Sequence, residues 1–279
     1  MDYYELQISL TPREPWAEIM TAQLADLGCD SFVETETGIL AYGPIDEIQL
    51  DEIQQLAVFQ NALQEVQSTL TVEVIKAQNW NAVWEADFEP VFVEDKLAIL
   101  APFHADSLQK ELTIYIEPKM SFGTGHHQTT WMMAKTLLDM KSMPSDILDM
   151  GSGTGVLAIL AEKLGGKKIL AIDIEDWAYD NAKDNIERNN CCEIEVLLGD
   201  VDLILAHRFN LIIANINKNV LKAHMESYSN TLLTNGILLL SGFFTSDIPE
   251  LTNVAKQFNL EYHSHLSKDN WACVKLIKQ

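Results

Sequence analysis

The sequence predicts an α/β protein built from a small N-terminal α+β unit and a larger unit with a mostly parallel sheet. Three observations favour this architecture. The length of 279 residues suits about two domains. From about residue 130, runs with helical spacing alternate with short apolar runs, which is typical of a parallel sheet with helices on both faces. One of these apolar runs leads directly into the three glycines Gly151, Gly153 and Gly155.

The first 78 residues follow the order strand, helix, strand, strand, helix, strand. Strands are predicted over 3–10, 32–35, 39–42 and 71–77, because apolar residues alternate there or flank a Thr-Gly turn. Helices are predicted over Trp16–Leu27, which ends before Gly28, and over Leu50–Val66, where apolar residues recur at helical spacing. This order is that of ferredoxin-like domains, which serve many functions.

The N-terminal unit is acidic. Residues 1–80 contain 14 Asp and Glu against two Lys and Arg, so the first third of the chain carries −12 of the total net charge of −22. Such a charge attracts a cationic ligand or a basic protein partner, although solubility alone could explain it. It counts against nucleic-acid binding, which needs clustered Lys and Arg.

Residues 79–89 are expected to be a linker, and residues 90–279 a second domain. Short strands are predicted first, over 91–93, 97–101 and 112–116. The alternating part then predicts helices over 130–140, 156–164, 177–189, 218–232 and 248–257, and strands over 146–149, 168–173, 194–198, 210–214 and 236–241. Two last strands, 260–266 and 271–277, surround a Lys-Asp-Asn turn and predict an antiparallel hairpin at the sheet edge.

Several classes of protein are disfavoured by the composition. No apolar run reaches the roughly 18 residues of a membrane span, and the acidic N-terminus does not resemble a signal peptide. The four cysteines show neither a C-x-x-C pair nor zinc-ligand spacing. We therefore expect reduced thiols, no metal site and a cytoplasmic protein.

The glycine run is the strongest local signal of a binding site. Glycine allows tight turns and close approach of a ligand, and the helix that follows presents an N-terminus that favours an anion. The dinucleotide fingerprint G-x-G-x-x-G would require glycine at position 156, which is Val156. The spacing therefore weakens the case for a nicotinamide site and favours a nucleoside ligand that carries a carboxylate. The alternative is a plain tight turn.

Two further polar residues follow predicted strands. Asp173 ends the next strand, 22 residues after Gly151, where an acid can accept hydrogen bonds from both ribose hydroxyls of a nucleoside. Asn215 ends the strand at 210–214, and its carbonyl oxygen can accept a hydrogen bond from an amine. Each could instead only cap a turn or a helix.

Together these residues resemble class I S-adenosylmethionine-dependent methyltransferases. Within that superfamily, the segment 121–130 (SFGTGHHQTT) resembles the F-G-T-G-x-H-x-T-T segment of the ribosomal protein L11 methyltransferases. The strand end at Leu211–Ile216 and the W-E-x-x-F-x-P run from Trp84 to Pro90 are similar to segments of the same family. The resemblance implies a Rossmann-like, seven-stranded methyltransferase sheet, the cofactor S-adenosylmethionine and a ribosomal protein substrate.

The resemblance also implies roles for individual residues. Those expected to bind the cofactor are Phe122, Gly123, Thr129, Thr130, Gly151, Gly153, Gly155, Asp173 and Asn215. Asn215 is in addition the expected catalytic residue, since it would hold the amino group that is methylated. The acceptor would be an N-terminal α-amine or lysine amines of ribosomal protein L11, which the acidic first domain would recognise. The enzyme is expected to act as a monomer.

The chain departs from the family pattern in the loop before the predicted helix. The family usually has Thr-His-Pro where this chain has His126, His127 and Gln128, so a rigid proline is lost. The two histidines could suggest a base or a metal site, but a structural role in the loop is favoured. Other readings stay open: a methyltransferase acting on another protein or a small-molecule amine, a non-catalytic adapter, or a nicotinamide oxidoreductase.

Overall fold

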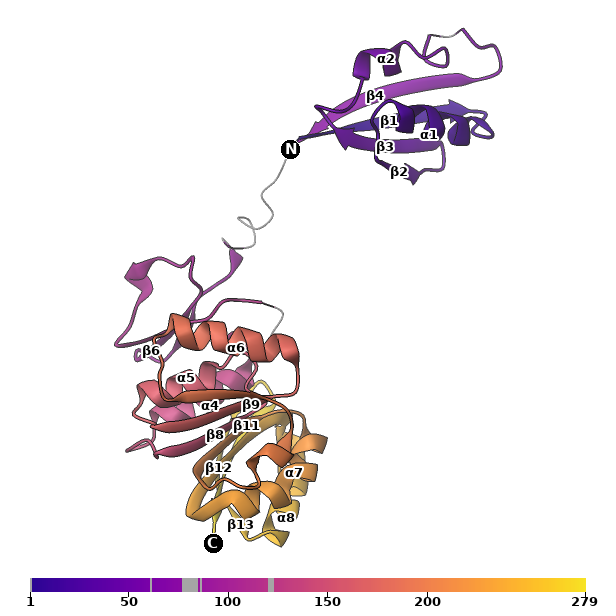
Figure 1. Cartoon of the computed structure of the whole chain (residues 1–279). Helices are drawn as coiled ribbons and strands as arrows, with labels where there is room; N and C mark the ends of the chain where they lie inside the picture. The colour runs from indigo at the N-terminus through magenta and orange to yellow at the C-terminus, as the bar shows by residue number, and fades with distance from the viewer. Residues whose placement is uncertain (1, 61, 77–84, 86, 120–122) are drawn as a thin grey trace. The chain divides into compact units, whose positions relative to one another are not determined.

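The computed structural model of the chain describes residues 2–60, 62–76, 85, 87–119 and 123–279. It divides into two compact units, Met1–Asp87 and Phe88–Gln279 (Figure 1). The expected linker over 79–89 lies mostly outside the described residues.

The first unit has a four-stranded antiparallel sheet with the strand order β2-β3-β1-β4. Its elements are β1 (Tyr3–Thr11), α1 (Trp16–Asp26), β2 (Ser31–Glu34), β3 (Gly38–Pro44), α2 (Leu50–Gln54) and β4 (Gln67–Ile75). The helices pack on one face of the sheet, where Leu6 and Ile8 of β1 meet Met20 of α1 and Ile53 of α2. The alternation of apolar residues along β1 is thereby explained, since every second side chain faces the helices.

The opposite face of this sheet carries charged and aromatic side chains. On β1, Glu5 lies directly opposite Tyr42 of β3 on one side and Glu73 of β4 on the other. Burial, together with a hydrogen bond to the Glu5 carboxylate, raises the pKa of Tyr42. We call this surface, defined by Glu5, Tyr42 and Glu73, the acidic sheet face.

The helix predicted over Leu50–Val66 is wrong in length, because α2 ends at Gln54. The side chain of Gln60 donates a hydrogen bond to the carbonyl of Gln54 at 2.8 Å, which satisfies the end of the short helix. Val58 and Val66 are nevertheless buried in the core of the unit. Irregular turns thus bury the same apolar residues that suggested a longer helix, and β4 begins earlier than predicted, at Gln67.

The second unit contains a mixed sheet of seven strands with the order β10-β9-β8-β11-β12-β14-β13. Its helices and strands are β5 (Val91–Val93), β6 (Leu97–Leu100), η1 (Asp106–Leu108), β7 (Leu112–Tyr115), α4 (Gln128–Leu138), β8 (Asp146–Met150), α5 (Val156–Lys163), β9 (Lys168–Asp173), α6 (Asp176–Arg188), β10 (Ile194–Leu198), η2 (Val201–Ile204), β11 (Phe209–Asn215), α7 (Lys218–Thr231), β12 (Leu232–Phe244), η3 (Thr245–Asp247), α8 (Ile248–Gln257), β13 (Leu260–Lys268) and β14 (Trp271–Lys278). Strands β5, β6 and β7 form a separate small sheet.

Helices cover both faces of the large sheet (Figure 1). Ile147 of β8 faces a core with α4, α5 and α6, whereas its neighbour Leu148 faces a core with α7 and α8. Five strands run parallel, and β14 pairs antiparallel with both β12 and β13. Because both faces of the sheet are covered there, the middles of the central parallel strands β8, β9 and β11 are mostly buried and apolar.

Within the part of the chain that the structure describes, no helix is long and apolar enough to cross a membrane. The four cysteines are free thiols, and Cys29 and Cys273 are buried. Burial raises the pKa of Cys29 to about 11 and that of Cys273 to about 12, so both stay protonated at neutral pH.

Candidate functional site

Three of the predicted site residues emerge where three adjacent strands end. In the sheet, Met150 of β8 is paired with Ile172 of β9 and with Ala214 of β11. Gly151, Asp173 and Asn215 each follow one of these paired residues directly. Since the strands are parallel, the three residues emerge side by side at one edge of the sheet, which is where open α/β sheets bind ligands.

The glycines form a tight turn between β8 and α5. The backbone amides of Gly151 and Ser152 both donate to the carbonyl of Ile172, at 2.8 and 3.0 Å. Gly151, Gly153 and Gly155 have positive φ angles of 73°, 54° and 77°. A Cβ atom on Gly151 would lie 2.2 Å from a methyl group of Ile216, so only glycine fits this turn.

Asp173 faces this turn. Its Oδ2 accepts a hydrogen bond from the amide of Gly153 at 2.8 Å, and its Oδ1 accepts one from the amide of Glu175 at 3.2 Å. The carboxylate is therefore fixed between the glycine turn and the start of α6, with lone pairs left for a ligand.

Asp149 is a buried acid below the turn, and the sequence pattern indicated no separate role for it. Its side chain is only 1% exposed, and its Oδ2 accepts a hydrogen bond from the amide of Ala158 in α5 at 3.0 Å. Burial raises the pKa of Asp149 to about 7, against the lowering effect of the Ala158 amide. The acid therefore holds α5 behind the turn and carries a proton over much of the acidic range.

Asn215 contacts the first turn of α4. Its Nδ2 lies 3.4 Å from the hydroxyl oxygen of Thr130, and both Thr129 and Thr130 are buried. The Oδ1 atom of Asn215 is buried and has no hydrogen-bond partner among the described residues. A buried acceptor without a partner is costly, so the arrangement fits a donor that arrives with a ligand.

The loop before α4 is attached to the glycine turn. Gly123 accepts a hydrogen bond from the hydroxyl of Thr154 at 2.7 Å, and a Cβ atom on Gly123 would stand 2.7 Å from the same hydroxyl. Phe122, which the resemblance assigns to this loop, lies outside the described residues.

Both histidines of the loop have structural contacts. His127 is the N-cap of α4: its Nδ1 accepts a hydrogen bond from the amide of Thr129, and its ring packs edge-on against Trp271. Burial lowers the pKa of His127. The Nε2 atom of His126 forms a hydrogen bond with the carbonyl oxygen of Glu89 at 2.8 Å. Among the described residues, no group of three or more His, Cys, Asp or Glu side chains is arranged to hold a metal ion.

A cavity of about 380 Å³ opens between the glycine turn, Asp173 and Asn215. Several of its lining residues were not singled out from the sequence, among them Ile174, Trp177, Asp200 and His224. Ile174 and Trp177 are large apolar side chains that are 64% and 49% exposed, which suits the face of an aromatic ring. From the sequence, Ile174 and Trp177 could have been noticed only as large apolar residues that follow the strand end at Asp173.

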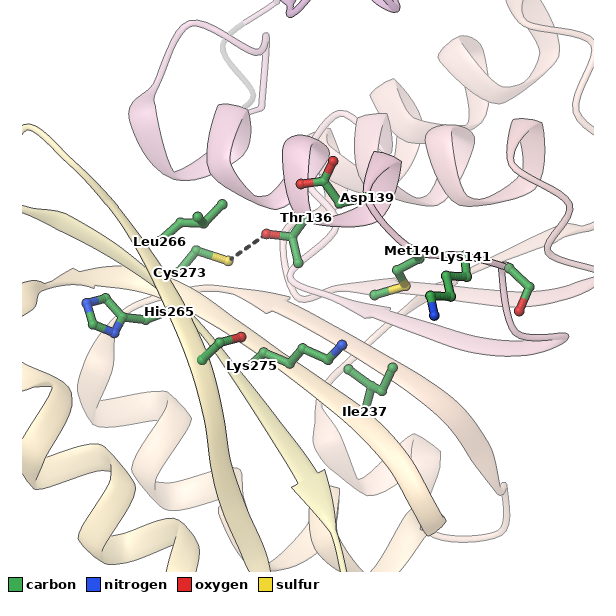
Figure 2. Close-up of a pocket in the computed structure, with 11 residues that line it drawn as sticks. Thr136, Asp139, Met140, Lys141, Ile237, His265, Leu266, Cys273 and Lys275 are labelled. Atoms are coloured by element: carbon green, nitrogen blue, oxygen red, sulfur yellow. Dashed lines mark hydrogen bonds between the residues drawn. The ribbon is translucent and has the colours of Figure 1, made fainter.

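A second hollow of about 500 Å³ lies away from these residues (Figure 2). It is lined by the end of α4 and by strands β12, β13 and β14. In its wall, the hydroxyl oxygen of Thr136 lies 3.7 Å from the sulfur atom of Cys273. Lys141, which follows α4, and Lys275 of β14 also line it. None of the predicted site residues lines it, so the smaller cavity is the better candidate.

Sequence comparison finds relatives over the whole chain. The model of the family described as ribosomal protein L11 methyltransferase matches residues 11–279. The chain is similar to the ribosomal protein L11 methyltransferase of Porphyromonas gingivalis, with 40% identity over 283 residues, 99% of this chain and 97% of that protein. It is also similar to that of Phocaeicola vulgatus, with 38% identity over 281 residues and 99% of each chain.

Among solved structures, the crystal structure described as ribosomal protein L11 methylase from Lactobacillus delbrueckii subsp. bulgaricus is similar. The TM-score is 0.62 at 24% sequence identity, and the match covers 69% of this chain and 100% of that chain. At this identity the likeness concerns the fold.

Proposed function

The chain belongs to the ribosomal protein L11 methyltransferase family, and from this premise we propose that it transfers methyl groups from S-adenosylmethionine to amino groups of ribosomal protein L11. Its large sheet is the mixed, seven-stranded sheet of methyltransferase folds. The nicotinamide oxidoreductase and the non-catalytic adapter are disfavoured by this family membership.

The observation that carries the site assignment is the buried oxygen of Asn215. Its Oδ1 has no partner among the described residues, although it lies at the strand-end edge beside the glycine turn. An amino group is a donor that would satisfy it. Asn215 is therefore the proposed catalytic residue, which holds the acceptor amine in the cavity.

The cavity suits S-adenosylmethionine by its chemistry. Asp173 offers a fixed carboxylate for the ribose hydroxyls, and Ile174 and Trp177 offer apolar surface for the adenine ring. Gly151, Gly153 and Gly155 would pass under the methionine part, as in the family. With Phe122, Gly123 and the first-turn residues Thr129 and Thr130 of α4 would belong to the segment that closes over it, although none of these three residues lines the cavity.

When bound, S-adenosylmethionine supplies an electrophilic methyl group on a sulfonium sulfur. The acceptor amine must be neutral, and an α-amine with a pKa of about 8 loses its proton more easily than a lysine with a pKa of about 10.4. Asn215 is a hydrogen-bond acceptor and not a base, so the proton is proposed to leave to water before the amine binds. Asn215 Oδ1 accepts an N–H of the neutral amine and so fixes the direction of its lone pair. The contribution of the protein is mainly alignment, which can lower a barrier by roughly 7–11 kcal/mol.

The N-terminal unit is the proposed recognition domain for the protein substrate. We assign residues 1–78 to this ferredoxin-like domain, 79–89 to a linker and 90–279 to the catalytic domain. Support comes from the strand order of its sheet, from the net charge of −12 over residues 1–80 and from the acidic sheet face. Glu5 and Glu73 lie opposite each other, an arrangement that destabilises the free sheet and that a basic partner surface would relieve.

We further propose that the enzyme is a cytoplasmic monomer that does not bind nucleic acid directly. Its acidic charge and its ribosomal protein substrate support this. The alternative, a methyltransferase for another protein or for a small amine, predicts turnover without ribosomal protein L11.

Calorimetric titration of the full chain tests the cofactor assignment. We expect S-adenosylmethionine and S-adenosylhomocysteine to bind with one site each, and NAD not to bind. Binding of NAD, or no binding of either adenosyl compound, would overturn the assignment.

A further inference from the structure

Three buried asparagines follow one another at four-residue spacing, Asn181 and Asn185 in helix α6 and Asn189 at its C-terminal cap. Their exposed fractions are 0%, 0% and 7%. Asparagine is unusual inside a protein unless its amide is fully hydrogen-bonded. The contacts of Asn185 and Asn189 account for their burial.

Asn189 completes the edge of the small sheet. Strand β7 is an edge strand, with Tyr115 paired to Leu100 of β6 on one side. On the other side, Asn189 Oδ1 accepts from the amide of Tyr115 at 2.9 Å, and its Nδ2 donates to the carbonyl of Tyr115 at 2.7 Å. The side chain thus takes the place of a neighbouring strand.

Asn185 makes the next contact along the same edge and also reaches the glycine turn. Its Oδ1 accepts from the amide of Glu117 at 2.9 Å, two residues beyond Tyr115. Residues four apart on a helix advance about 6 Å, and residues two apart on a strand about 6.6 Å, so the two asparagines match the strand. In addition, Asn185 Nδ2 donates to the carbonyl of Thr154 in the glycine turn at 3.0 Å.

Thr154 closes the connection. Its carbonyl is held by Asn185, and its hydroxyl donates to the carbonyl of Gly123 at 2.7 Å. Glu117 and Gly123, six residues apart, are therefore both tied to the same turn, one through Asn185 and one through Thr154. On the surface, Arg188 pairs with Glu117 at 3.0 Å, which supports the same attachment.

We propose that Asn185 is a positioning residue for the cofactor site, because its amide joins the backbone of Glu117 to the carbonyl of Thr154 in the glycine turn, which in turn holds Gly123. The inference rests on the proposed function, since the turn and the loop at 123–130 are the parts assigned to S-adenosylmethionine. Asn189 caps the same helix and is similarly buried, but no hydrogen bond joins it to the turn among the described residues.

The test compares Asn185→Ala with Asn189→Ala in the full chain. Both changes remove a buried amide, so we expect similar losses of thermal stability. Only Asn185→Ala is expected to raise the Kd for S-adenosylmethionine, by about tenfold, and to speed amide hydrogen exchange over residues 123–130 in the ligand-free protein. Equal Kd values and equal exchange in the two variants would overturn the proposal.

A second pair of variants covers the case in which Asn185→Ala does not fold. Thr154→Val keeps the shape of the side chain but loses the bond to Gly123, and Thr154→Ser keeps the hydroxyl. In Thr154→Val we expect faster amide exchange over residues 123–130 and a higher Kd for S-adenosylmethionine. In Thr154→Ser we expect both quantities to return towards the wild-type values. An unchanged Val variant, or a Ser variant no better than Val, would contradict the proposal.

The ligand-free exchange separates two kinds of failure. If the wild type does not bind S-adenosylmethionine, the proposed function is wrong, while the exchange over 123–130 still decides whether Asn185 positions the loop. If the wild type binds and the paired variants do not differ, the positioning role is wrong.

Discussion

The two units of the molecule differ in where they keep their polar side chains. All eleven polar or charged side chains that are buried among the described residues lie in the second unit, including Asp149, Thr154 and Asn185. The first unit holds its acids at the surface, and they carry more than half of the net charge of the chain.

The two units are therefore expected to contribute to function in different ways. In the second unit, buried hydrogen bonds hold a few atoms in fixed positions, so single changes should have large effects. In the first unit, attraction of a basic partner depends on many surface charges, which solvent screens, so each should contribute little.

The largest effect is expected at Asp149, as a dependence of stability on pH. Its pKa is raised to about 7 in the folded protein and is about 4 in the unfolded chain. The folded protein therefore keeps a proton that the unfolded chain loses, and the free energy of unfolding falls as pH rises from about 4 to about 7, by up to ~4 kcal/mol. Urea unfolding of wild type and Asp149→Asn across this range measures it.

The amide side chain introduced by that substitution does not ionise, so the variant should lack this part of the pH dependence. If the free energy of unfolding depends on pH equally in the two proteins, the pKa of Asp149 is the same in the folded and unfolded states.

The second effect is on turnover. Asn215→Ala removes the acceptor proposed to orient the amine, and kcat for ribosomal protein L11 should fall about 100-fold, whereas the Kd for S-adenosylmethionine should change much less. Steady-state kinetics and calorimetry separate the two. Asn219→Ala, a change on the first turn of α7, is the matched control. A fall in binding as large as the fall in kcat would contradict the assignment.

The third effect is on cofactor affinity. Loss of the carboxylate in Asp173→Ala removes charged hydrogen bonds, and the Kd for S-adenosylmethionine should rise about 30-fold. Asp180→Asn, on the exposed surface of α6, changes the net charge equally and should bind like wild type. Equal affinity of the Asp173 variant and wild type would rule out the ribose contact.

A smaller effect is expected on the acidic sheet face. The double change Glu5→Gln and Glu73→Gln should raise KM for ribosomal protein L11 about threefold at low salt and leave the cofactor Kd unchanged, because it weakens only the attraction of a basic surface. Glu18→Gln with Glu52→Gln, on the helices of the same unit, removes the same charge elsewhere. If the control raises KM equally, the effect belongs to net charge and not to this face.

The smallest effect is expected at Gln128, where the family usually has proline. Gln128 is the first residue of α4, a position that accepts proline, and His127 before it has the extended φ and ψ of −71° and 140° that proline requires. Its side chain donates to Asp269 at 3.0 Å on the surface. Gln128→Pro should change the free energy of unfolding by less than about 0.5 kcal/mol and should be slightly more stable than Gln128→Ala. Thermal unfolding of the three proteins measures this, and a large loss for proline would show that the Asp269 contact matters.

The sequence predicted the parts of the fold that depend on local patterns. Glycine spacing and the polar residues after apolar runs placed Gly151, Asp173 and Asn215 correctly at one sheet edge, because parallel strands end together. The helix over Leu50–Val66 was overextended, because burial of Val58 and Val66 does not require a helix.

Other features depend on contacts between distant residues and could not be predicted. Asn189 bonds Tyr115, 74 residues away, and Asn185 bonds Thr154, 31 residues away, so neither pairing leaves a local signal. The burial of Asp149 was equally hidden, because an acid in a strand does not reveal which helix covers it.

Methyl transfer to purified ribosomal protein L11 tests the central claim most directly. The full chain would be incubated with labelled S-adenosylmethionine and L11, followed by intact mass measurement and mapping of the modified sites. We predict label on amino groups of L11, at the N-terminus or on lysines, and initial labelling about 100-fold slower with Asn215→Ala. Unmodified L11 in a preparation that binds S-adenosylmethionine would contradict the claim and move the acceptor to another protein or a small amine.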